Sequence, residues 1–275
     1  MTEPILTVDG LTITFPTAQG PINVVDGVSF VLGQEKLGIV GESGSGKSMT
    51  ARALMGLVPP PGKVAARVLS YRGESLMDAP AERLRKLRGA HLSMILQDPK
   101  FSLNPVMRIG DQIAEAVRLH ATTTRAQAKQ SALALLDRVR IDGPDRVYGL
   151  YPHEISGGMG QRVMIAMMIA ANPDILIADE PTSALDVTIR GQVLDLLDEL
   201  IAEHNTSLIF ISHDLNLVAR YCDRILVMYQ GRVMETLPAA DLHQSEHPYT
   251  RGLVECLPRL SDHRERLPTL DRTTL

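Results

Sequence analysis

Residues 41–48 have the types and the spacing of a phosphate-binding loop, Gly-Glu-Ser-Gly-Ser-Gly-Lys-Ser. An apolar run typical of a strand precedes them, and a run typical of a helix follows. Glycines let the backbone wrap around phosphate oxygens, a lysine supplies positive charge to the β- and γ-phosphates, and a serine hydroxyl can bind Mg²⁺. We therefore predict a nucleoside triphosphate site in which Lys47 and Ser48 take these last two roles.

Polar residues that could do chemistry follow three apolar runs further along the chain. Gln97 follows the first run, Asp179 and Glu180 the second, and His213 the third. In parallel sheets, ligand chemistry concentrates at the carboxyl ends of strands. Asp179 fits a ligand of Mg²⁺ or of its water, Glu180 could polarise a water that attacks a γ-phosphate, and His213 could hydrogen-bond that phosphate. Taken alone, Gln97 reads as a turn residue and His213 as a structural histidine. Their shared place after apolar strands, together with Asp179 and Glu180, favours one convergent site.

A turn made of Ser156, Gly157 and Gly158 precedes a predicted helix over residues 159–171. Backbone amides at the start of a helix favour the binding of an anion. The turn has no catalytic side chain of its own, and it lies in sequence between the predicted phosphate loop and the Asp179-Glu180 pair. We hypothesise that it serves a phosphate held by another subunit.

Composition limits the class of protein. The 275 residues are 44% apolar but only 4% aromatic, with no Trp, so a core must be built from aliphatic residues and Met. The net charge is −4 and there is no Lys/Arg block, so a nucleic-acid partner is not expected. Cys222 and Cys256 lack a metal-type spacing and are expected to be reduced thiols. We expect no signal peptide and no membrane-spanning segment, so work at a membrane would require a spanning partner.

Hydrophobic periodicity predicts an antiparallel beginning and a helical middle. Alternation over residues 5–15, interrupted by Asp9-Gly10, predicts a hairpin, and strands are predicted at 28–32 and 36–40. Phe15 in this region is either a core residue or a stacking platform for adenine. Residues 100–150 read as an all-helical insertion, with helices at 109–119 and 126–139. The tail from about residue 240 is polar and interrupted by prolines, and it ends without obvious structure.

Together these motifs resemble the ATP-binding subunit of ABC transporters, over residues of about 5–240. The resemblance rests on several motifs in the family's order: residues 41–48 look like the Walker A loop, Gln97 like the Q-loop glutamine, 156–158 like the signature motif, 175–180 like Walker B with its catalytic glutamate, 183–186 like the D-loop, His213 like the switch histidine, and Phe15 like the adenine-stacking aromatic.

The resemblance implies an α/β fold: a P-loop NTPase with a RecA-like parallel-sheet core, an N-terminal antiparallel β subdomain and an inserted α-helical subdomain. It also implies ATP and Mg²⁺ as cofactors. The implied catalytic residues are Glu180, His213 and Gln97; the implied metal-binding residues are Ser48, Gln97 and Asp179; and the implied nucleotide-binding residues are Phe15, Gly41, Ser43, Gly44, Ser45, Gly46, Lys47, Ser48, Met49, Ser156, Gly157, Gly158 and Asp186.

A narrower resemblance points to the importer branch for oligopeptides, dipeptides and nickel. It rests on residues 97–106, on 109–113, and on the sequence His-Pro-Tyr-Thr-Arg-Gly-Leu at 247–253. This branch implies a D-type ATPase subunit with a homologous F-type partner, two transmembrane permeases and a periplasmic or lipid-anchored solute-binding protein. It implies a peripheral place on the cytoplasmic face of the bacterial inner membrane. The expected domains are 1–245 for the cassette, with the helical insertion at about 98–165, and 246–275 for a C-terminal tail.

The chain departs from the family pattern at two positions and leaves some functions open. Met159 stands where Gln is frequent and Gly160 where Arg is common, from which we expect a modest effect. Cys256 alone does not supply the Cys cluster that some relatives carry for an iron–sulfur centre. A soluble ABC-type ATPase acting on DNA or ribosomes, and a regulatory subunit without ATPase activity, are the alternatives from other classes. Within transport, the cargo stays open between peptides, nickel chelates and other small solutes.

Overall fold

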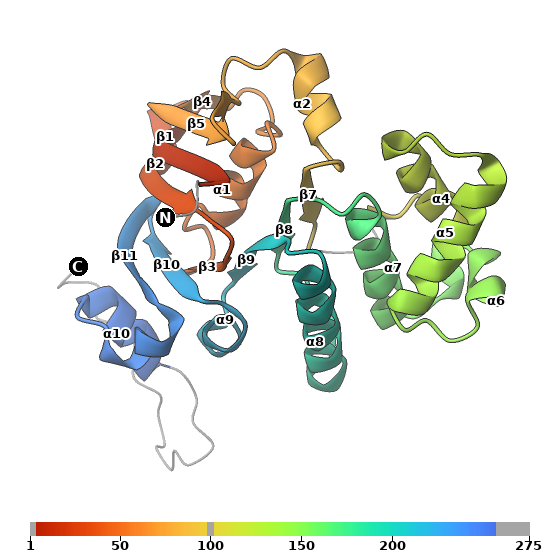
Figure 1. Ribbon diagram of the computed structural model, residues 1–275. Coiled ribbons are helices and arrows are strands. Elements are labelled where there is room, and N and C mark those ends of the chain that lie inside the picture. The colour runs from red at the N-terminus through yellow and green to blue at the C-terminus, as the bar shows by residue number, and fades with distance from the viewer. Residues whose placement is uncertain (1–3, 98–101, 257–275) are drawn as a thin grey trace, which may run out of the picture. The chain divides into compact units, whose positions relative to one another are not determined.

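The computed structural model describes residues 4–97 and 102–256, which form two compact units (Figure 1). Of the described residues, 4–78 and 209–256 belong to the first unit, and 79–97 and 102–208 belong to the second. Each unit carries its own part of the predicted chemistry: the phosphate loop and His213 belong to the first, and Gln97, Asp179, Glu180 and the Ser156 turn belong to the second.

The first unit begins with an antiparallel sheet in the strand order β2-β1-β5-β6, with β4 paired to β1. This confirms the antiparallel β subdomain at the N-terminus. Leu11, Ile13 and Val25 are fully buried from solvent on one face of the long β1–β2 ribbon. The strands are β1 (Leu6–Thr17), β2 (Gly20–Leu32), β4 (Lys63–Ala65), β5 (Val68–Tyr71) and β6 (Glu74–Ser75).

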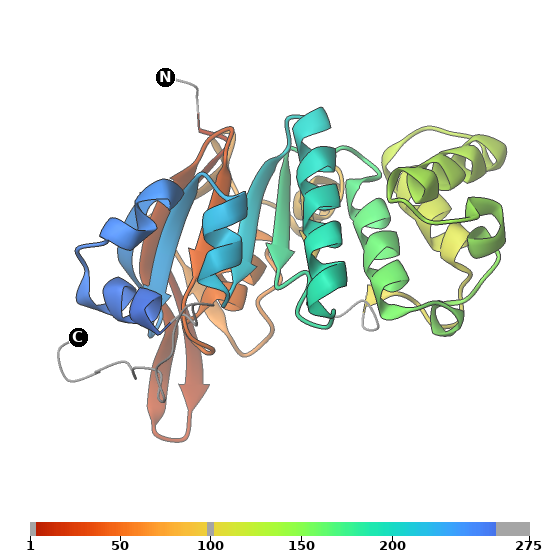
Figure 2. The same ribbon diagram turned by 90° about the horizontal axis from the view of Figure 1, so that it is seen from below.

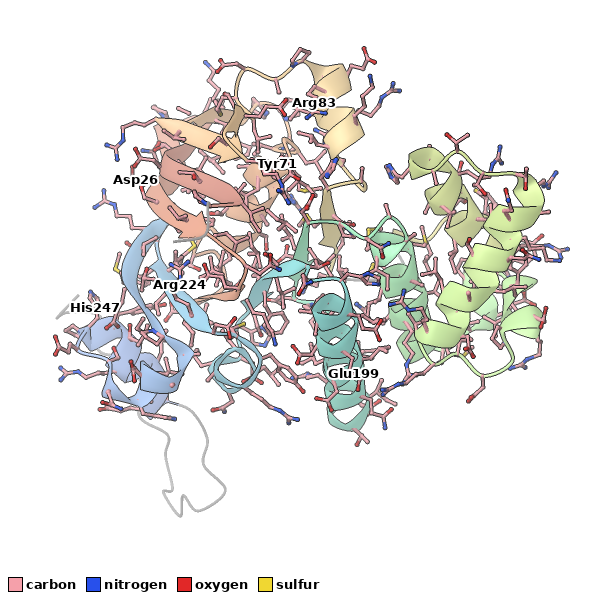
Figure 3. The ribbon with its side chains drawn as sticks, viewed as in Figure 1. Asp26, Tyr71, Arg83, Glu199, Arg224 and His247 are labelled. Carbon is pink, nitrogen blue, oxygen red and sulfur yellow. The ribbon has the colours of Figure 1, made fainter. Side chains whose placement is uncertain are left out.

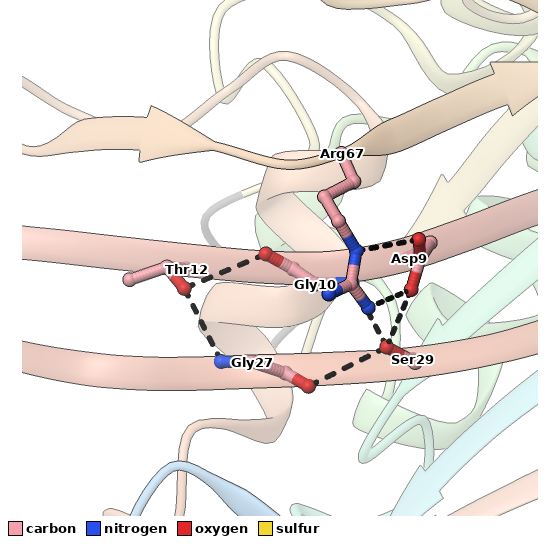
Figure 4. A network of polar contacts seen from close by, with 6 residues as sticks. All are labelled: Asp9, Gly10, Thr12, Gly27, Ser29 and Arg67. Carbon is pink, nitrogen blue, oxygen red and sulfur yellow. Dashed lines mark hydrogen bonds and ion pairs between the residues drawn. The ribbon is translucent and has the colours of Figure 1, made fainter.

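The prediction of a hairpin turn at Asp9-Gly10 is wrong, because β1 continues through these residues as a bulge. Gly10 takes a left-handed φ of 64°, its N–H donates to the Ser29 hydroxyl on β2 at 2.8 Å, and Arg67 pairs with the Asp9 carboxylate at 2.5 Å (Figure 4). A Gly in this conformation suits a bulge as well as a turn. The actual hairpin joins β1 to β2 between Thr17 and Gly20.

The rest of the first unit surrounds a mainly parallel set of strands in the order β11-β10-β3-β9. β3 pairs in parallel with β10, and β10 pairs antiparallel with β11. Residue 38 of β3 must be a glycine, because a Cβ there would lie 2.0 Å from Cγ1 of Val218 on α9. The elements are β3 (Lys36–Val40), α1 (Lys47–Leu54), β9 (Ser207–Ser212), α9 (Leu215–Tyr221), β10 (Arg224–Tyr229) and β11 (Arg232–Pro238).

An ion pair fastens the start of β10 beside the start of β3. Arg224, labelled in Figure 3, donates to the Glu35 carboxylate at 2.7 Å and 3.1 Å, and it also donates to the carbonyl of Val31. Burial alone would raise the pKa of Glu35, but the hydrogen bonds from Arg224 and from the Gly33 amide outweigh burial and lower that pKa. The ion pair therefore holds the start of β10 next to the start of β3. β3 leads into the predicted phosphate loop, and β10 leads into the turn before β11.

The polar tail contains structure that periodicity did not predict. A 3₁₀ helix, η2 (Ala239–Gln244), follows β11, and α10 (Pro248–Glu255) follows η2. α10 packs on β11 and η2, and it lies beside them in both views (Figures 1 and 2). Tyr249, Thr250 and Val254 of α10 are buried. The prediction from the sequence thus missed η2 and α10. The end of the tail, residues 257–275, lies outside the described part, so the expectation that it lacks structure stays a prediction.

The second unit combines two parallel strands with a helical cluster. β7 (Leu92–Ile95) and β8 (Ile175–Asp179) pair in parallel, and both are buried along their length. The predicted helices are present, and a capping box of Thr124 and Gln127 begins α5. Within the described residues, no helix combines the length and apolar character needed to cross a membrane. The helices are α2 (Ala81–Leu87), α4 (Ile109–His120), α5 (Arg125–Arg138), α6 (Pro144–Tyr148), η1 (Pro152–Glu154), α7 (Gly157–Ile169) and α8 (Val187–Glu203).

The close approach of α9 to β3 yields a stability prediction. Gly38→Ala places a methyl group against Val218, so we expect the free energy of unfolding in urea to fall by about 1–3 kcal/mol. The double variant Gly38→Ala/Val218→Ala should be more stable than Gly38→Ala alone, because removal of the valine methyl groups relieves the overlap. Equal stability of the two variants would contradict this packing.

Candidate functional site

The predicted phosphate loop joins β3 to α1 in the first unit, and its glycines take backbone conformations that other residues adopt rarely. Gly41, Gly44 and Gly46 have φ values of 152°, 79° and 99°. Gly46 is the left-handed N-cap of α1, and its carbonyl accepts hydrogen bonds from the amide and the hydroxyl of Thr50 at 2.8 Å and 3.0 Å. The loop thus turns sharply and leads directly into a helix N-terminus, where an anion is favoured.

Lys47 lies inside this loop and is only 6% exposed. Its Nζ donates hydrogen bonds to the carbonyls of Gly41 and Glu42 at 2.8 Å each, and to the hydroxyl of Ser45 at 3.4 Å. A buried ammonium group requires such oxygen partners, because burial without them costs several kcal/mol. The turn of the loop brings the Gly41 and Glu42 carbonyls to the Lys47 ammonium, and their hydrogen bonds with it in turn hold the loop in this conformation.

Neighbouring backbone segments press on the loop from two sides. A Cβ at Gly41 would lie 2.1 Å from the carbonyl oxygen of Met228 on β10, and a Cβ at Gly46 would lie 2.7 Å from that of Val24 on β2. The amide of Gly231, in the turn between β10 and β11, donates to the carbonyl of Ser45 at 3.1 Å. Glycine at positions 41 and 46 is consequently required by packing as well as by φ.

Outside the phosphate loop, two further residues of the first unit are predicted to bind ATP: Phe15, which lies on β1, and His213, which follows β9. Phe15 is half-buried on β1, and its ring packs on Gly62, where a Cβ would come within 2.6 Å of the ring. His213 follows β9 and is exposed, while Asp214 caps α9 by accepting from the amides of Asn216 and Leu217. The roles of Phe15 at adenine and of His213 at a phosphate stay predictions.

In the second unit, the structure brings together polar residues from the ends of two strands. Gln97, two residues after β7, donates from Nε2 to Oε2 of Glu180 at 3.2 Å, and the Ser183 hydroxyl donates to the Gln97 carbonyl at 3.5 Å. Asp179 ends β8 and is 6% exposed, and Glu180 follows it with a left-handed φ of 47°. The convergence of strand ends that the sequence predicts is thus present for Gln97 and Glu180. Asp98 and Pro99, the rest of the predicted polar break after β7, lie outside the described residues.

The Ser156 turn is a helix N-terminus, as predicted. The hydroxyl of Ser156 caps α7 by accepting from the Met159 amide at 3.3 Å. A Cβ at Gly158 would lie 3.0 Å from Ile189 of α8, whereas a Cβ at Gly157 would meet nothing within 4 Å. Among the described residues, packing therefore does not require glycine at position 157, because a Cβ there would meet open space.

Two residues have contacts that the sequence did not indicate. Asp186, predicted to bind nucleotide, caps α8 by accepting from the amides of Thr188 and Ile189 at 3.1 Å each. Tyr249, to which no chemistry was assigned, accepts a hydrogen bond from the amide of Glu42 in the phosphate loop at 3.4 Å. The sequence signal at Tyr249 is its place in the His-Pro-Tyr motif. That motif indicates membership of the importer branch but says nothing about which residues Tyr249 contacts.

Comparison with known proteins identifies the family to which this chain belongs. A model of the ABC transporter family matches residues 25–183, which include the phosphate loop, Gln97, the Ser156 turn and Glu180. The chain belongs to the ABC transporter family. It is similar to the oligopeptide transport ATP-binding protein OppD of Escherichia coli, with 46% identity over 98% of this chain and 80% of that protein. It is similar also to the dipeptide transport ATP-binding protein DppD of the same organism, with 47% identity over 97% and 82%.

Solved structures agree with this family and confirm the P-loop NTPase fold. A dimeric post-hydrolysis state of the ATP-binding cassette MJ0796, bound to ADP and Pi, matches with a TM-score of 0.73 and 26% identity over 85% of this chain and 98% of that one. CbiO1 of Clostridium perfringens matches with a TM-score of 0.74 at 23% identity, over 92% of this chain and 95% of that one, which supports the fold alone. This ABC transporter chain is therefore an ATP-binding cassette of the ATPase class.

The tight fit at Gly46 yields a prediction about ATP binding. Gly46→Ala would force a methyl group against the Val24 carbonyl, so we expect loss of ATP binding in calorimetry together with a lower melting temperature. Gly44→Ala is the matched control, because φ is again left-handed but nothing lies within 4 Å. The control should keep more of the affinity, and equal loss in both variants would show that φ strain alone is responsible.

Proposed function

We propose that this chain is the ATP-hydrolysing subunit of a bacterial importer for peptides or related small solutes. The observation that carries the proposal is the hydrogen-bonded pair of Gln97 and Glu180 at the ends of β7 and β8, in a chain that also builds a phosphate loop around Lys47. Relatives named for peptide import, including a putative peptide import ATP-binding protein of Brucella abortus with 48% identity, align over almost the whole chain and support peptides as cargo. None of these names favours DNA or ribosomes.

ATP binding is assigned to the loop and its neighbours. The loop amides of residues 41–49 and the Lys47 ammonium would hold the phosphates, and Phe15 would stack on adenine. Magnesium, when bound, would neutralise charge on the β- and γ-phosphates. The Ser48 hydroxyl, the Gln97 side chain and the Asp179 carboxylate suit this ion, because Mg²⁺ takes few protein oxygens and completes its shell with water and phosphate.

Hydrolysis is assigned to Glu180, which would polarise the attacking water and draw its proton as the oxygen bonds to the γ-phosphorus. Gln97 would orient Glu180 through the hydrogen bond between their side chains. His213 would donate a hydrogen bond to the γ-phosphate and stabilise the charge that develops there. The bond between the β- and γ-phosphates then breaks, and ADP and phosphate leave.

The Ser156 turn supplies a second half-site. We assign the amides of Ser156, Gly157 and Gly158 and the positive end of α7 to the γ-phosphate of ATP held by a partner cassette, with Asp186 close to the same interface. The MJ0796 cassette forms a dimer, which supports such an arrangement. The proposed partner is a homologous F-type ATPase subunit.

The proposed assembly also includes two permeases and a solute-binding protein, at the cytoplasmic face of the inner membrane. Within the cassette of residues 1–245, an insertion at about 98–165 would pass motion to the permeases, and residues 246–275 would form a C-terminal extension.

Removal of the Glu180 carboxylate tests the proposed reaction. In the assembled transporter, Glu180→Gln should lower ATP turnover by a factor of about 100 or more, because loss of a general base costs that much, while ATP binding persists. Uptake of a labelled peptide into cells that lack the native subunit should fall with it. Glu203→Gln on the second unit, which removes only a surface pair with Arg138, is the control. Wild-type turnover in Glu180→Gln would refute the base assignment, and intact turnover without peptide uptake by the wild type would refute the cargo.

A negative charge at Gly157 tests the half-site. Gly157→Asp adds a carboxylate in the first turn of α7, where the helix dipole stabilises it by about 0.3–1 kcal/mol, so the fold should not suffer. The same charge repels a phosphate, and we expect ATP turnover of the assembled transporter to fall at least about tenfold while the isolated subunit binds ATP with unchanged affinity. Gly191→Asp, at another glycine with nothing within 4 Å, is the control. Loss of ATP affinity in the isolated Gly157→Asp subunit would contradict a site completed in trans.

A further inference from the structure

The C-terminal helix reaches the phosphate loop through one hydroxyl group. Tyr249 in the first turn of α10 is fully buried, and its phenol oxygen accepts the hydrogen bond from the amide of Glu42 at 3.4 Å. The two residues are 207 positions apart in the chain. A buried Tyr hydroxyl needs a polar partner, and here a partner is the backbone of the loop that the ATPase uses for phosphate.

The Tyr249 ring is held in place by its surroundings. It packs against the ring of Tyr229, at the end of β10, with centroids 4.6 Å apart and planes 40° apart. His247, labelled in Figure 3, caps α10 by accepting from the Tyr249 amide at 3.2 Å, and Pro248 occupies the first turn. Proline at the start of a helix restricts the backbone there. The hydroxyl therefore approaches the loop from a rigid support.

The segment that leads into α10 is fastened to β11. The Ser245 hydroxyl donates to the Glu235 carboxylate at 2.6 Å. Burial alone would raise the pKa of Glu235, but hydrogen bonds led by that of Ser245 lower it below its ordinary value, so the carboxylate is charged at neutral pH. The position of α10 thus depends on β11, whose turn from β10 also binds the loop at Ser45.

Glu42 is the residue at which this support meets the Lys47 charge. Its carbonyl accepts a hydrogen bond from the Lys47 ammonium at 2.8 Å, and its amide donates to Tyr249. A rotation of the backbone around Glu42 would move the carbonyl and with it the ammonium. An anchor on the amide therefore limits where Lys47 can present its charge to a phosphate.

We propose that Tyr249 is a positioning residue for ATP binding, which holds the phosphate loop in the conformation that places the Lys47 ammonium. The proposal rests on the proposed function of residues 41–48 as the nucleotide loop. It gives the His-Pro-Tyr segment a role in the ATP site of its own chain. A purely structural role in the core would require the aromatic ring but not its hydroxyl group.

The experiment removes one hydroxyl at a time from the full chain. Tyr249→Phe keeps the ring and its packing on Tyr229 but loses the acceptor for Glu42. Tyr229→Phe removes the neighbouring hydroxyl, whose hydrogen bond comes from the Gln230 side chain at 3.2 Å and not from the phosphate loop. Lys47→Ala is the third variant and tests the loop itself. ATP affinity and stoichiometry are measured by calorimetry, the melting temperature by calorimetric scanning, and backbone protection at Glu42 by amide hydrogen exchange.

We expect Tyr249→Phe to weaken ATP binding roughly 3- to 10-fold, the size of one hydrogen bond, with unchanged stoichiometry and faster exchange at Glu42. Tyr229→Phe should bind ATP as the wild type does. A variant that only unfolds more easily would lose stoichiometry and melting temperature and keep the affinity of its folded fraction. In the assembled transporter, Tyr249→Phe should raise KM for ATP and leave kcat within about twofold.

The outcomes separate this proposal from the proposed function. Equal ATP affinities in Tyr249→Phe and Tyr229→Phe, with binding abolished in Lys47→Ala, would overturn the role of Tyr249 alone. Wild-type ATP affinity in Lys47→Ala would overturn the assignment of the loop and the Tyr249 proposal with it. A fall in stoichiometry without a change in affinity in Tyr249→Phe would also overturn the proposal, since it would leave only a role in folding.

Discussion

The burial of one positive charge governs the architecture of the first unit. The Lys47 ammonium is nearly removed from solvent, and a charge in that position is tolerable only where oxygens surround it. The oxygens come from Gly41 and Glu42, so the chain must double back within six residues, and only glycines can make that path. The carbonyls of Met228 and Val24 and the amide of Gly231 then keep the path from relaxing. β2, β10 and the turn between β10 and β11 thus restrict the conformation of this loop through close backbone contacts.

The second unit solves a different problem, which is to hold carboxylates at the edge of an apolar interior. β7 and β8 are buried along their whole length, and the carboxylates of Asp179 and Glu180 lie at the last residue of β8 and directly after it. Glu180 does not continue the strand, because its left-handed backbone changes the direction of the chain. The side-chain amide of Gln97 donates a hydrogen bond to the Glu180 carboxylate there. The helix starts at Ser156 and Asp186 each satisfy their first amides with a side-chain oxygen, so both turns are fixed locally.

Local chemistry was readable from the sequence, and long-range contacts were not. The phosphate loop, the helix start at Ser156 and the carboxylates at the end of β8 depend on neighbours in the chain, and their motifs predicted them. Asp9-Gly10 is compatible with a turn and with a bulge. The bulge is stabilised by two long-range contacts: Gly10 with Ser29, 19 residues away, and Asp9 with Arg67, 58 residues away. α10 is a short helix that depends on β11, η2 and Tyr229 for its burial, so its own residues carried little periodic signal. The same distance hid the contact between Tyr249 and Glu42.

The left-handed backbone at Glu180 also restricts what evolution can place there. Branched side chains such as Val, Ile and Thr are disfavoured at a φ of 47° whatever their chemistry, and most residues other than Gly and Asn bear a strain there on the order of 1 kcal/mol. Position 180 therefore has two independent requirements: the proposed reaction needs a carboxylate, and the backbone needs a residue that adopts a left-handed φ. A library covering all twenty amino acids at this codon would separate them, since glycine and asparagine satisfy the second without meeting the first. The backbone thus restricts the residue that we propose to polarise the attacking water, independently of its chemistry.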